Sequence, residues 1–466
     1  MHFPNKDSIE KYNQVFDRAK EGLNAKQALA VDHIYGPVMT VAGPGTGKTQ
    51  LLAVRVGNIL RTTDVKIGNV LCMTFTEAGS IAMRERLTRF IGPEAYNAKI
   101  FTFHSFCNYI IQENIQYFGG YRNLQIASEL ELVDIYRELI DSFDDDHPLK
   151  RFKGNIYFDT NRLKNLFNTM KQEGWTPEMI EKEVNSLYDF YTERDENGDV
   201  INDKFLCKRK QKGKLTGKEY QKGEVNLDKV QMEIDKYEGL VEGAKAIKKY
   251  NELLAKYERY DYNDMILWVV EALKENDDLL ATYQERFQFI LVDEFQDTNG
   301  TQNELLFLLA DNVIDDRPNI FIVGDDDQSI YRFQGANMNN ILDFADKYNP
   351  IEVVLEKNYR STQKILDLST RLIEFNNERL IKKRPHLTKF LEAERNDLPD
   401  NAQDPQIMRF QNSMQEEKWI INDILRKHRD GVPYKDMAIL YKKHRLVEDI
   451  VTYLSLHNIP INIKKY

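Results

Sequence analysis

Short apolar runs alternate with helical stretches along the first 118 residues. Three such runs stand at 37–43, 69–76 and 98–103, and the apolar residues between them recur at helical spacing. This alternation is typical of a parallel sheet with helices on its faces. The sequence therefore predicts an α/β fold class for this part of the chain.

The pattern changes between about residues 119 and 258. Apolar residues recur there at helical spacing, as in 129–143 and 161–174, and a polar, glycine-containing stretch at 192–204 interrupts them. We expect an all-helical insertion in this region.

Runs of the strand type return at 286–294 and 319–325, where short β-rich segments are flanked by acidic residues. They are expected to be later strands of the first sheet, resumed after the insertion. A second α/β unit is expected to begin near Ile351 and to continue through the segments 406–412 and 437–443.

Length and composition place the chain among soluble globular proteins. It has 466 residues, of which 42% are hydrophobic and 30% charged. At about 100–200 residues per domain, this length suggests about three units, and no apolar run approaches the roughly 20 residues of a membrane span. The N-terminus lacks a secretory signal, and Cys72, Cys107 and Cys207 stand too far apart for a disulfide framework or a CxxC metal site. We expect a cytoplasmic protein.

The charge balance argues against a protein that binds nucleic acid through its overall charge. The 64 Lys and Arg residues are outnumbered by 74 Asp and Glu residues, for a net charge of −10. Positive charge is densest at 204–223, with eight Lys or Arg residues against one Glu. This basic segment is either a solvated loop or a contact with the DNA backbone.

A glycine-rich segment at 41–50 follows an apolar strand and precedes a good helix at 51–60. A phosphate-binding loop requires this context, because its backbone N–H groups and the helix N-terminus face the anion. Lys48 is expected to reach the outer phosphates of a nucleotide, and the Thr49 hydroxyl to bind Mg²⁺. The expected nucleotide-binding residues of the loop are Ala42, Gly43, Pro44, Gly45, Thr46, Gly47, Lys48, Thr49 and Gln50, with Ala42 where the strict pattern has glycine.

Two adjacent carboxylates follow a buried type of strand at 289–292. The carboxyl ends of parallel strands point toward the nucleotide crevice, so Asp293 and Glu294 are expected to lie near the loop. Asp293 is expected to hold Mg²⁺, and Glu294 to orient and deprotonate the attacking water.

Further segments follow in the order that UvrD/Rep-like superfamily 1 helicases show, and the chain resembles that family over nearly its whole length apart from the insertion. These segments are LNAKQ at 23–27, FTEAGSIAMRERL at 75–87, TFHSF at 102–106, YDYNDMI at 260–266, GDDDQSIYRFQGA at 324–336 and NYRST at 358–362. The resemblance implies an ATP-dependent DNA helicase that couples Mg-ATP hydrolysis to 3′ to 5′ movement on single-stranded DNA and to duplex unwinding. It also implies a part in DNA repair or replication restart.

The resemblance also implies a P-loop NTPase fold with RecA-like domains. On this basis the first RecA-like motor domain comprises 1–118 and 259–345, the helical insertion domain 119–258, and a partial second RecA-like domain 346–466. Later segments of the family's second domain, with a further arginine finger, are not found. The chain is therefore expected to be part of a longer helicase, and to hydrolyse ATP slowly and unwind poorly by itself.

The family pattern assigns roles around the nucleotide. Gln27 is expected to read adenine through its amide, and Tyr359 to stack on adenine. Gln328 is expected to sense the γ-phosphate, and Arg360 to act on it as an arginine finger, with a surface salt bridge as the alternative for Arg360.

For DNA, aromatic rings that stack on unpaired bases are the candidates, with burial in the core as the alternative for each ring. Gln334 stands where the family commonly has arginine, which puts tight DNA binding there in doubt. The expected DNA contacts are Phe75, Thr102, His104, Tyr331 and Phe333.

The expected cofactors are ATP and Mg²⁺, and the expected partners are single-stranded DNA and single-strand/duplex junctions. We expect a monomer that does not associate with membranes. Two rival functions remain open: a nucleotide-binding, DNA-binding module without unwinding activity, and the motor part of a helicase–nuclease subunit.

Overall fold

A six-stranded parallel sheet forms the centre of the first of two compact units, residues 1–398 and 399–466. The computed structural model describes residues 6–121, 123–150, 155–196, 198–311, 317–329, 339–395 and 404–463. The strand order is β10-β1-β9-β8-β2-β3. The strands are β1 (Val38–Ala42), β2 (Val70–Thr74), β3 (Lys99–Thr102), β8 (Phe289–Val292), β9 (Ile320–Gly324) and β10 (Ile351–Leu355). The predicted α/β class and the return of its strands after the insertion are confirmed.

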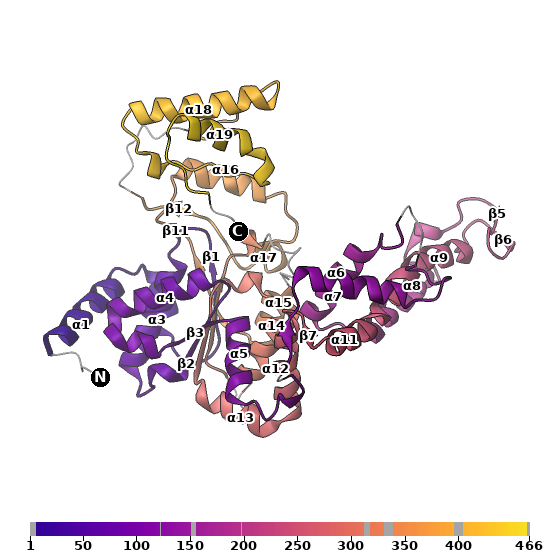
Figure 1. The fold of residues 1–466 in the computed structure, drawn as a ribbon, viewed down its shortest axis with the longest axis horizontal. Helices are drawn as coiled ribbons and strands as arrows, with labels where there is room; N and C mark the ends of the chain where they lie inside the picture. The colour runs from indigo at the N-terminus through magenta and orange to yellow at the C-terminus, as the bar shows by residue number, and fades with distance from the viewer. Residues whose placement is uncertain are drawn as a thin grey trace. The chain divides into compact units, whose positions relative to one another are not determined.

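Successive residues of the central strands face opposite hydrophobic cores. In β2, Leu71 and Met73 belong to one core, whereas Val70 and Cys72 belong to the other. Because both faces are covered by helices, these strands are apolar throughout rather than alternating. Figure 1 shows the sheet with helices on both sides.

The helices divide between the two faces. One face is covered by α1 (Lys6–Glu21), α2 (Ala25–Asp32), α3 (Lys48–Thr62) and α4 (Glu77–Ile91). The other is covered by α5 (Phe103–Glu113), α12 (Asp264–Glu275), α13 (Asp277–Arg286), α14 (Gly300–Ala310), α15 (Asn339–Tyr348) and α17 (Leu380–Lys383). No helix among the described residues has the length and apolar character needed to cross a membrane.

The insertion has a hydrophobic core of its own, built mainly from its helices. It contains α6 (Glu129–Asp141), α7 (Thr160–Glu173), α8 (Pro177–Thr192), α9 (Leu227–Ile234), α10 (Glu238–Lys245) and α11 (Ile247–Lys256). Strand β4 (Gln125–Ile126), near its start, pairs with β7 (Arg259–Tyr260), just after its end. The insertion is not helical throughout, because β5 (Gln211–Lys212) and β6 (Glu219–Tyr220) form an antiparallel hairpin.

Strand β10 lies beyond the boundary predicted at residue 345, yet it belongs to the first sheet. It pairs in parallel with β1, from Val38 opposite Ile351 to Ala42 opposite Leu355. An apolar run cannot reveal which sheet it will join, because strand pairing is a long-range choice. The chain then forms β11 (Lys357–Asn358), α16 (Gln363–Ile373) and β12 (Glu392–Ala393), and β11 pairs in parallel with β12.

The second unit packs α18 (Ser413–Arg429) against α19 (Glu448–Leu456) around a small core that includes Ile421 and Ile450. The segments 406–412 and 437–443, where further α/β structure was expected, form no strand. Leu440 is 95% exposed, so its segment lacks the neighbour that a buried strand requires.

Candidate nucleotide site

The phosphate loop joins the end of β1 to the start of α3. Gly45 and Gly47 have φ angles of +70° and +87°, a region that glycine adopts without steric cost. The buried Thr46 hydroxyl donates to the carbonyl of Gly43 at 2.8 Å and closes the loop. These contacts hold the loop at the N-terminus of α3, where helix geometry favours an anion.

Lys48 and Glu294 meet between the loop and the end of β8. The Lys48 Nζ lies 2.5 Å from Glu294 Oε2, and the Lys48 side chain is only 10% exposed. Glu294 has a φ angle of +50°, which is unusual for a residue with a side chain and sets its direction at the strand end. The sequence-predicted phosphate ligand and general base are thus brought together.

Asp293 is buried beside this pair. Burial, and then the charge of Glu294, raises the pKa of Asp293 to about 7. Its carboxylate accepts a hydrogen bond from the Glu294 N–H at 3.0 Å. Carboxylate and hydroxyl oxygens suit Mg²⁺, and the cost of keeping Asp293 charged here is one that a divalent cation would offset. Asp293 therefore fits the predicted metal site, with Thr49 in the first turn of α3 as its predicted companion.

Gln296 connects the acidic pair to the next strand, a role that was not predicted. Its amide N–H group donates to Glu294 Oε2 at 3.0 Å, and its Oε1 accepts from the Asp325 N–H at 2.9 Å. A side chain at Gly324 would meet Gln296 Oε1 at 2.7 Å, so glycine is needed there. In the sequence, only the position of Gln296 within VDEFQDTN indicated that this residue could matter. Its hydrogen-bond partner on the next strand could not be predicted from the sequence.

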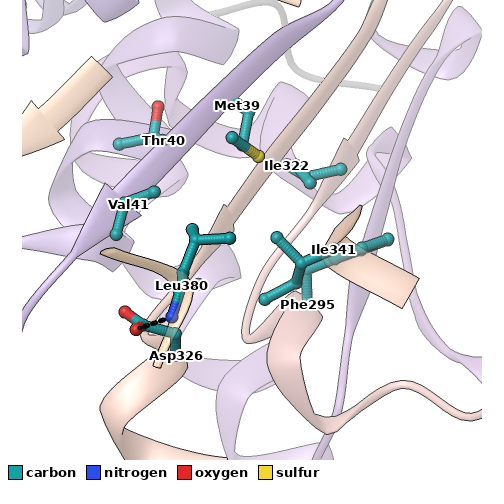
Figure 2. A pocket seen from close by; sticks show the side chains of 9 residues that line it. Met39, Thr40, Val41, Phe295, Ile322, Asp326, Ile341 and Leu380 are labelled. Carbon is teal, nitrogen blue, oxygen red and sulfur yellow. Dashed lines mark hydrogen bonds between the residues drawn. The ribbon is translucent and has the colours of Figure 1, made fainter. Parts of the chain in front are cut away.

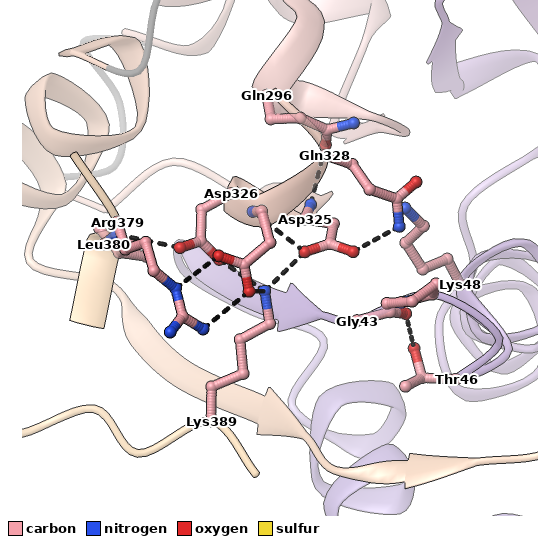
Figure 3. A network of polar contacts seen from close by, with 12 residues as sticks. Gly43, Thr46, Lys48, Gln296, Asp325, Asp326, Gln328, Arg379, Leu380 and Lys389 are labelled. Atoms are coloured by element: carbon pink, nitrogen blue, oxygen red, sulfur yellow. Dashed lines mark hydrogen bonds and ion pairs between the residues drawn. The ribbon is translucent and has the colours of Figure 1, made fainter. Parts of the chain in front are cut away.

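Three successive carboxylates follow β9 and are compensated by two cations from distant segments (Figure 3). The Lys389 Nζ contacts the carboxylates of Asp325, Asp326 and Asp327 at 2.5, 2.7 and 2.9 Å. Arg379 donates to both oxygens of Asp327 at 2.6 and 2.9 Å. Burial lowers the pKa of Lys389, but the three carboxylates raise it by more, so this lysine stays protonated.

Gln328 lies at the end of the same turn. Its amide nitrogen donates to Asp325 Oδ2, and Figure 3 shows its side chain directed toward Lys48. The predicted γ-phosphate sensor is therefore close to the phosphate loop and is held by a carboxylate.

The NYRST segment lies directly on the phosphate loop. Tyr359 N–H donates to the Gly45 carbonyl at 2.9 Å, and the Asn358 amide donates to the Pro44 carbonyl. Asn358 also accepts from the N–H groups of Arg360 and Ser361 at 2.8 and 2.7 Å. Asn358, which was not predicted, thus fixes the turn that carries Tyr359 and Arg360.

Arg360 stands against the loop, because a Cβ added at Gly45 would meet the Arg360 Cβ at 2.6 Å. The Tyr359 hydroxyl accepts from the Asn24 side chain at 3.1 Å. Both residues lie at the edge of the loop, and their roles toward adenine and the γ-phosphate remain predictions.

Gln27 uses both ends of its amide within the protein. Its Nε2 donates to the Thr46 carbonyl at 2.9 Å, and its Oε1 accepts from the Asn24 N–H at 3.0 Å. The second contact is part of a capping box at the start of α2. Gln27 therefore links α2 to the phosphate loop, and its reading of adenine remains a prediction.

Comparison with known proteins agrees with this geometry. Residues 23–349 match the UvrD/REP helicase N-terminal domain, and residues 353–466 match the UvrD-like helicase C-terminal domain. The chain belongs to the UvrD/Rep helicase family. It is 30% identical over 441 residues to the ATP-dependent DNA helicase PcrA of Staphylococcus epidermidis, and 29% identical over 421 residues to PcrA of Staphylococcus aureus.

The first alignment covers 94% of this chain and 50% of the relative, and the second covers 90% and 48%. This UvrD/Rep family chain thus spans about half the length of the curated relatives it matches. The match to the first family domain ends at residue 349 and the match to the second begins at residue 353, near the predicted boundary at 345. Strand β10 nevertheless completes the first sheet.

The residues predicted to contact DNA have mixed surroundings in this UvrD/Rep family chain. Phe75 is half-buried in the link between β2 and α4. The Thr102 hydroxyl caps α5 and donates to Glu77 at 3.3 Å, so it has a structural function. Tyr331 and Phe333, like Gln334, lie outside the described residues.

The His104 ring packs against Tyr262 with ring centroids 4.1 Å apart and the ring planes tilted by 43°. Burial lowers the pKa of His104 to about 4, so the ring is neutral near pH 7. A charged contact between His104 and a DNA phosphate is therefore unfavourable at that pH, and a neutral hydrogen bond is what the ring can offer.

The basic segment 204–223 is built around the β5–β6 hairpin and is not an unstructured loop. Asp228 accepts from the N–H groups of Leu215 and Thr216 at 2.6 and 2.8 Å and from the Tyr220 hydroxyl at 2.9 Å. A small core that includes Tyr191, Val225 and Val230 lies next to it. Its exposed cationic side chains include Lys208, Arg209, Lys212, Lys214, Lys218 and Lys222.

Proposed function

We propose that this chain binds Mg-ATP at the phosphate loop and couples its hydrolysis to 3′ to 5′ movement on single-stranded DNA and to duplex unwinding. The observation that carries the proposal is the contact between Lys48 and Glu294, at 2.5 Å, beside the phosphate loop. One residue is suited to bind phosphate oxygens and the other to accept a proton from water. A loop that merely bound nucleotide would not need the second.

Each residue at the site has a separate task in this proposal. Lys48 would bind the outer phosphates, and Thr49 and Asp293 would hold Mg²⁺, whose charge would help neutralise the phosphate oxygens. A phosphate bound to Lys48 would release Glu294 to orient the attacking water. Gln296 keeps the Glu294 carboxylate in place through its hydrogen bond of 3.0 Å.

Tyr359 and Arg360 would complete the site from the NYRST segment. Tyr359 would stack on adenine, which Gln27 would read, and Arg360 would stabilise charge on the transferred phosphoryl group as an arginine finger. Their position on the loop is supported by the hydrogen bond from Tyr359 N–H to the Gly45 carbonyl.

The DNA side of the proposal rests on two groups of residues. Phe75, Tyr331 and Phe333 would stack on unpaired bases, with Thr102 and His104 near the backbone. The basic hairpin would contact the phosphates of the duplex ahead of the junction, because its cations are clustered on a structured element of an otherwise acidic chain. We further propose that the protein works as a cytoplasmic monomer in DNA repair.

The test is ATP hydrolysis with and without single-stranded DNA, on the unchanged chain and on Lys48→Ala. DNA-stimulated hydrolysis that is lost in Lys48→Ala supports a motor. Nucleotide-dependent DNA binding without hydrolysis would favour the non-enzymatic module. Nucleotide binding that survives in Lys48→Ala would overturn the assignment of the phosphate loop.

A further inference from the structure

Lys389 is an almost completely buried cation in contact with three carboxylates. Its side chain is 1% exposed, and those of Asp325 and Asp326 are not exposed at all. Three acidic side chains that lie so close to one another could together bind a metal ion. Here the ammonium group of Lys389 occupies the point where the three carboxylates converge. The cluster is therefore organised around an internal cation.

The charges of the cluster are not fully balanced. Three carboxylates face two cations, Lys389 and Arg379, and Arg379 forms its ion pair with Asp327. Burial raises the pKa of Asp325, whereas Lys389 and, more weakly, Lys48 lower it. Lys389 is thus the main cation that compensates Asp325, and Lys48 is the next.

Lys389 is not the only residue that anchors its own segment to the sheet. Leu380 is fully buried and lines a small pocket together with Met39, Val41 and Ile322 (Figure 2), and its N–H donates to Asp326 at 2.9 Å. Leu387, two residues before Lys389, also belongs to this core. Apolar burial therefore helps to hold the segment independently of the ammonium of Lys389.

Asp325 connects this lysine to the nucleotide site. One of its carboxylate oxygens receives Lys389 at 2.5 Å, and the other receives the amide of Gln328. A terminal phosphate would need the same two donors that Asp325 attracts, the Gln328 amide and the Lys48 ammonium. An uncompensated Asp325 carboxylate would compete with that phosphate for both.

We propose that Lys389 is a positioning residue for the nucleotide: it holds and neutralises Asp325, so that Gln328 and Lys48 remain available to the terminal phosphate of ATP. The inference rests on the proposed function, because it needs a nucleotide at the phosphate loop. Lys389 lies outside every recognised motif, and in this proposal it helps the protein to distinguish ATP from ADP. Lys389 belongs to the part of the chain that matches the C-terminal family domain, so it also ties that part to the state of the site.

The experiment compares the affinity for a non-hydrolysable ATP analogue with that for ADP, both with Mg²⁺, in the full chain. In Lys389→Met the affinity for the analogue is expected to fall about tenfold, the scale of one charge-assisted hydrogen bond, while ADP affinity changes less than about twofold. Lys389→Arg, which keeps the charge, is expected to retain most of the preference for the analogue.

Asp325→Asn supplies the decisive second variant. If Lys389 acts by neutralising Asp325, the Lys389→Met change should have no further effect on the preference once residue 325 is uncharged. The double variant removes one carboxylate together with one cation, so it leaves the net charge of the cluster as it is, and it therefore remains informative if Lys389→Met alone does not fold. Melting temperatures measured on every variant identify those that fold.

The matched control is Lys171→Met. Lys171 is also a buried lysine between two carboxylates, Asp261 and Asp264, each at 2.6 Å, but it lies in the insertion. Its removal should lower the melting temperature without changing the preference for the ATP analogue over ADP.

Equal loss of ATP-analogue and ADP affinity in Lys389→Met, or no loss of either, would overturn the inference. So would an undiminished effect of Lys389→Met in the Asp325→Asn background. A failure of nucleotide binding, on which the proposed function depends, is distinguishable, because the unchanged chain would then bind neither nucleotide. A failure of hydrolysis alone would leave this comparison of affinities intact.

Discussion

Lys48 Nζ and Glu294 Oε2 lie 2.5 Å apart, although 246 positions separate the two residues in the sequence. The pair joins a phosphate ligand to a general base, and each neutralises the other at the edge of the sheet. A nucleotide phosphate at Lys48 would therefore change the environment of Glu294 directly. Binding and hydrolysis can be separated by changing one member of the pair at a time.

Glu294→Gln is expected to keep Mg-ATP binding and to lower the DNA-stimulated kcat by at least about 100-fold, because the amide cannot accept a proton from water. Single-turnover hydrolysis and nucleotide titration measure the two effects. Glu304, on α14 and paired with Lys274, supplies the matched Glu→Gln control. A Glu294→Gln protein with undiminished kcat would remove Glu294 from the mechanism.

Arg360→Ala is expected to lower kcat by about 1,000-fold or more, since an arginine finger stabilises charge that develops during phosphoryl transfer. Its effect on ADP affinity should be small. Arg426→Ala is the control, because Arg426 is 55% exposed and pairs with Asp423 in the second unit. A similar kcat for both variants would favour a surface role for Arg360.

Charge reversal of Lys212, Lys214 and Lys218 in the basic hairpin is expected to weaken binding to a duplex with a single-stranded tail. Each lost phosphate contact should reduce the slope of log affinity against log salt by about 0.9. Binding to single-stranded DNA alone should change much less. Reversal of Lys245, Lys248 and Lys249, which face glutamates on the same insertion, is the control. Equal salt slopes for the two triple variants would show that the hairpin is only a solvated surface.

His104 should make stability depend on pH. Its folded pKa of about 4 is lower than the ordinary value of 6.5, so the unfolded chain binds a proton at a higher pH than the folded one. Above pH 6.5 the neutral ring makes its full contribution to the free energy of unfolding. This contribution decreases as the pH drops toward 4, by at most about 3 kcal/mol. Urea unfolding across this range should show that loss, and His104→Phe should lack this component. An unchanged pH dependence in His104→Phe would assign it to other groups.

The pattern of the sequence determined the strands and the chemistry at their ends. Strands buried on both faces appear as continuous apolar runs, and glycines with Lys48 and Thr49 between a strand and a helix specify a phosphate loop. The family then follows from motif order, and matching to the family domains confirmed it.

Only the tertiary structure decided which distant side chains compensate one another. The hydrogen bond from Asn358 to Pro44 joins positions 314 residues apart, and the one from Lys389 to Asp325 joins positions 64 residues apart. In neither pair does the local sequence around one residue predict the other. The same is true of β10, whose apolar run fits either domain until it pairs with β1. Local spacing fixes helices, strands and loops, whereas the contacts between them depend on strand order and on the burial of charge, which arise only when the whole chain packs.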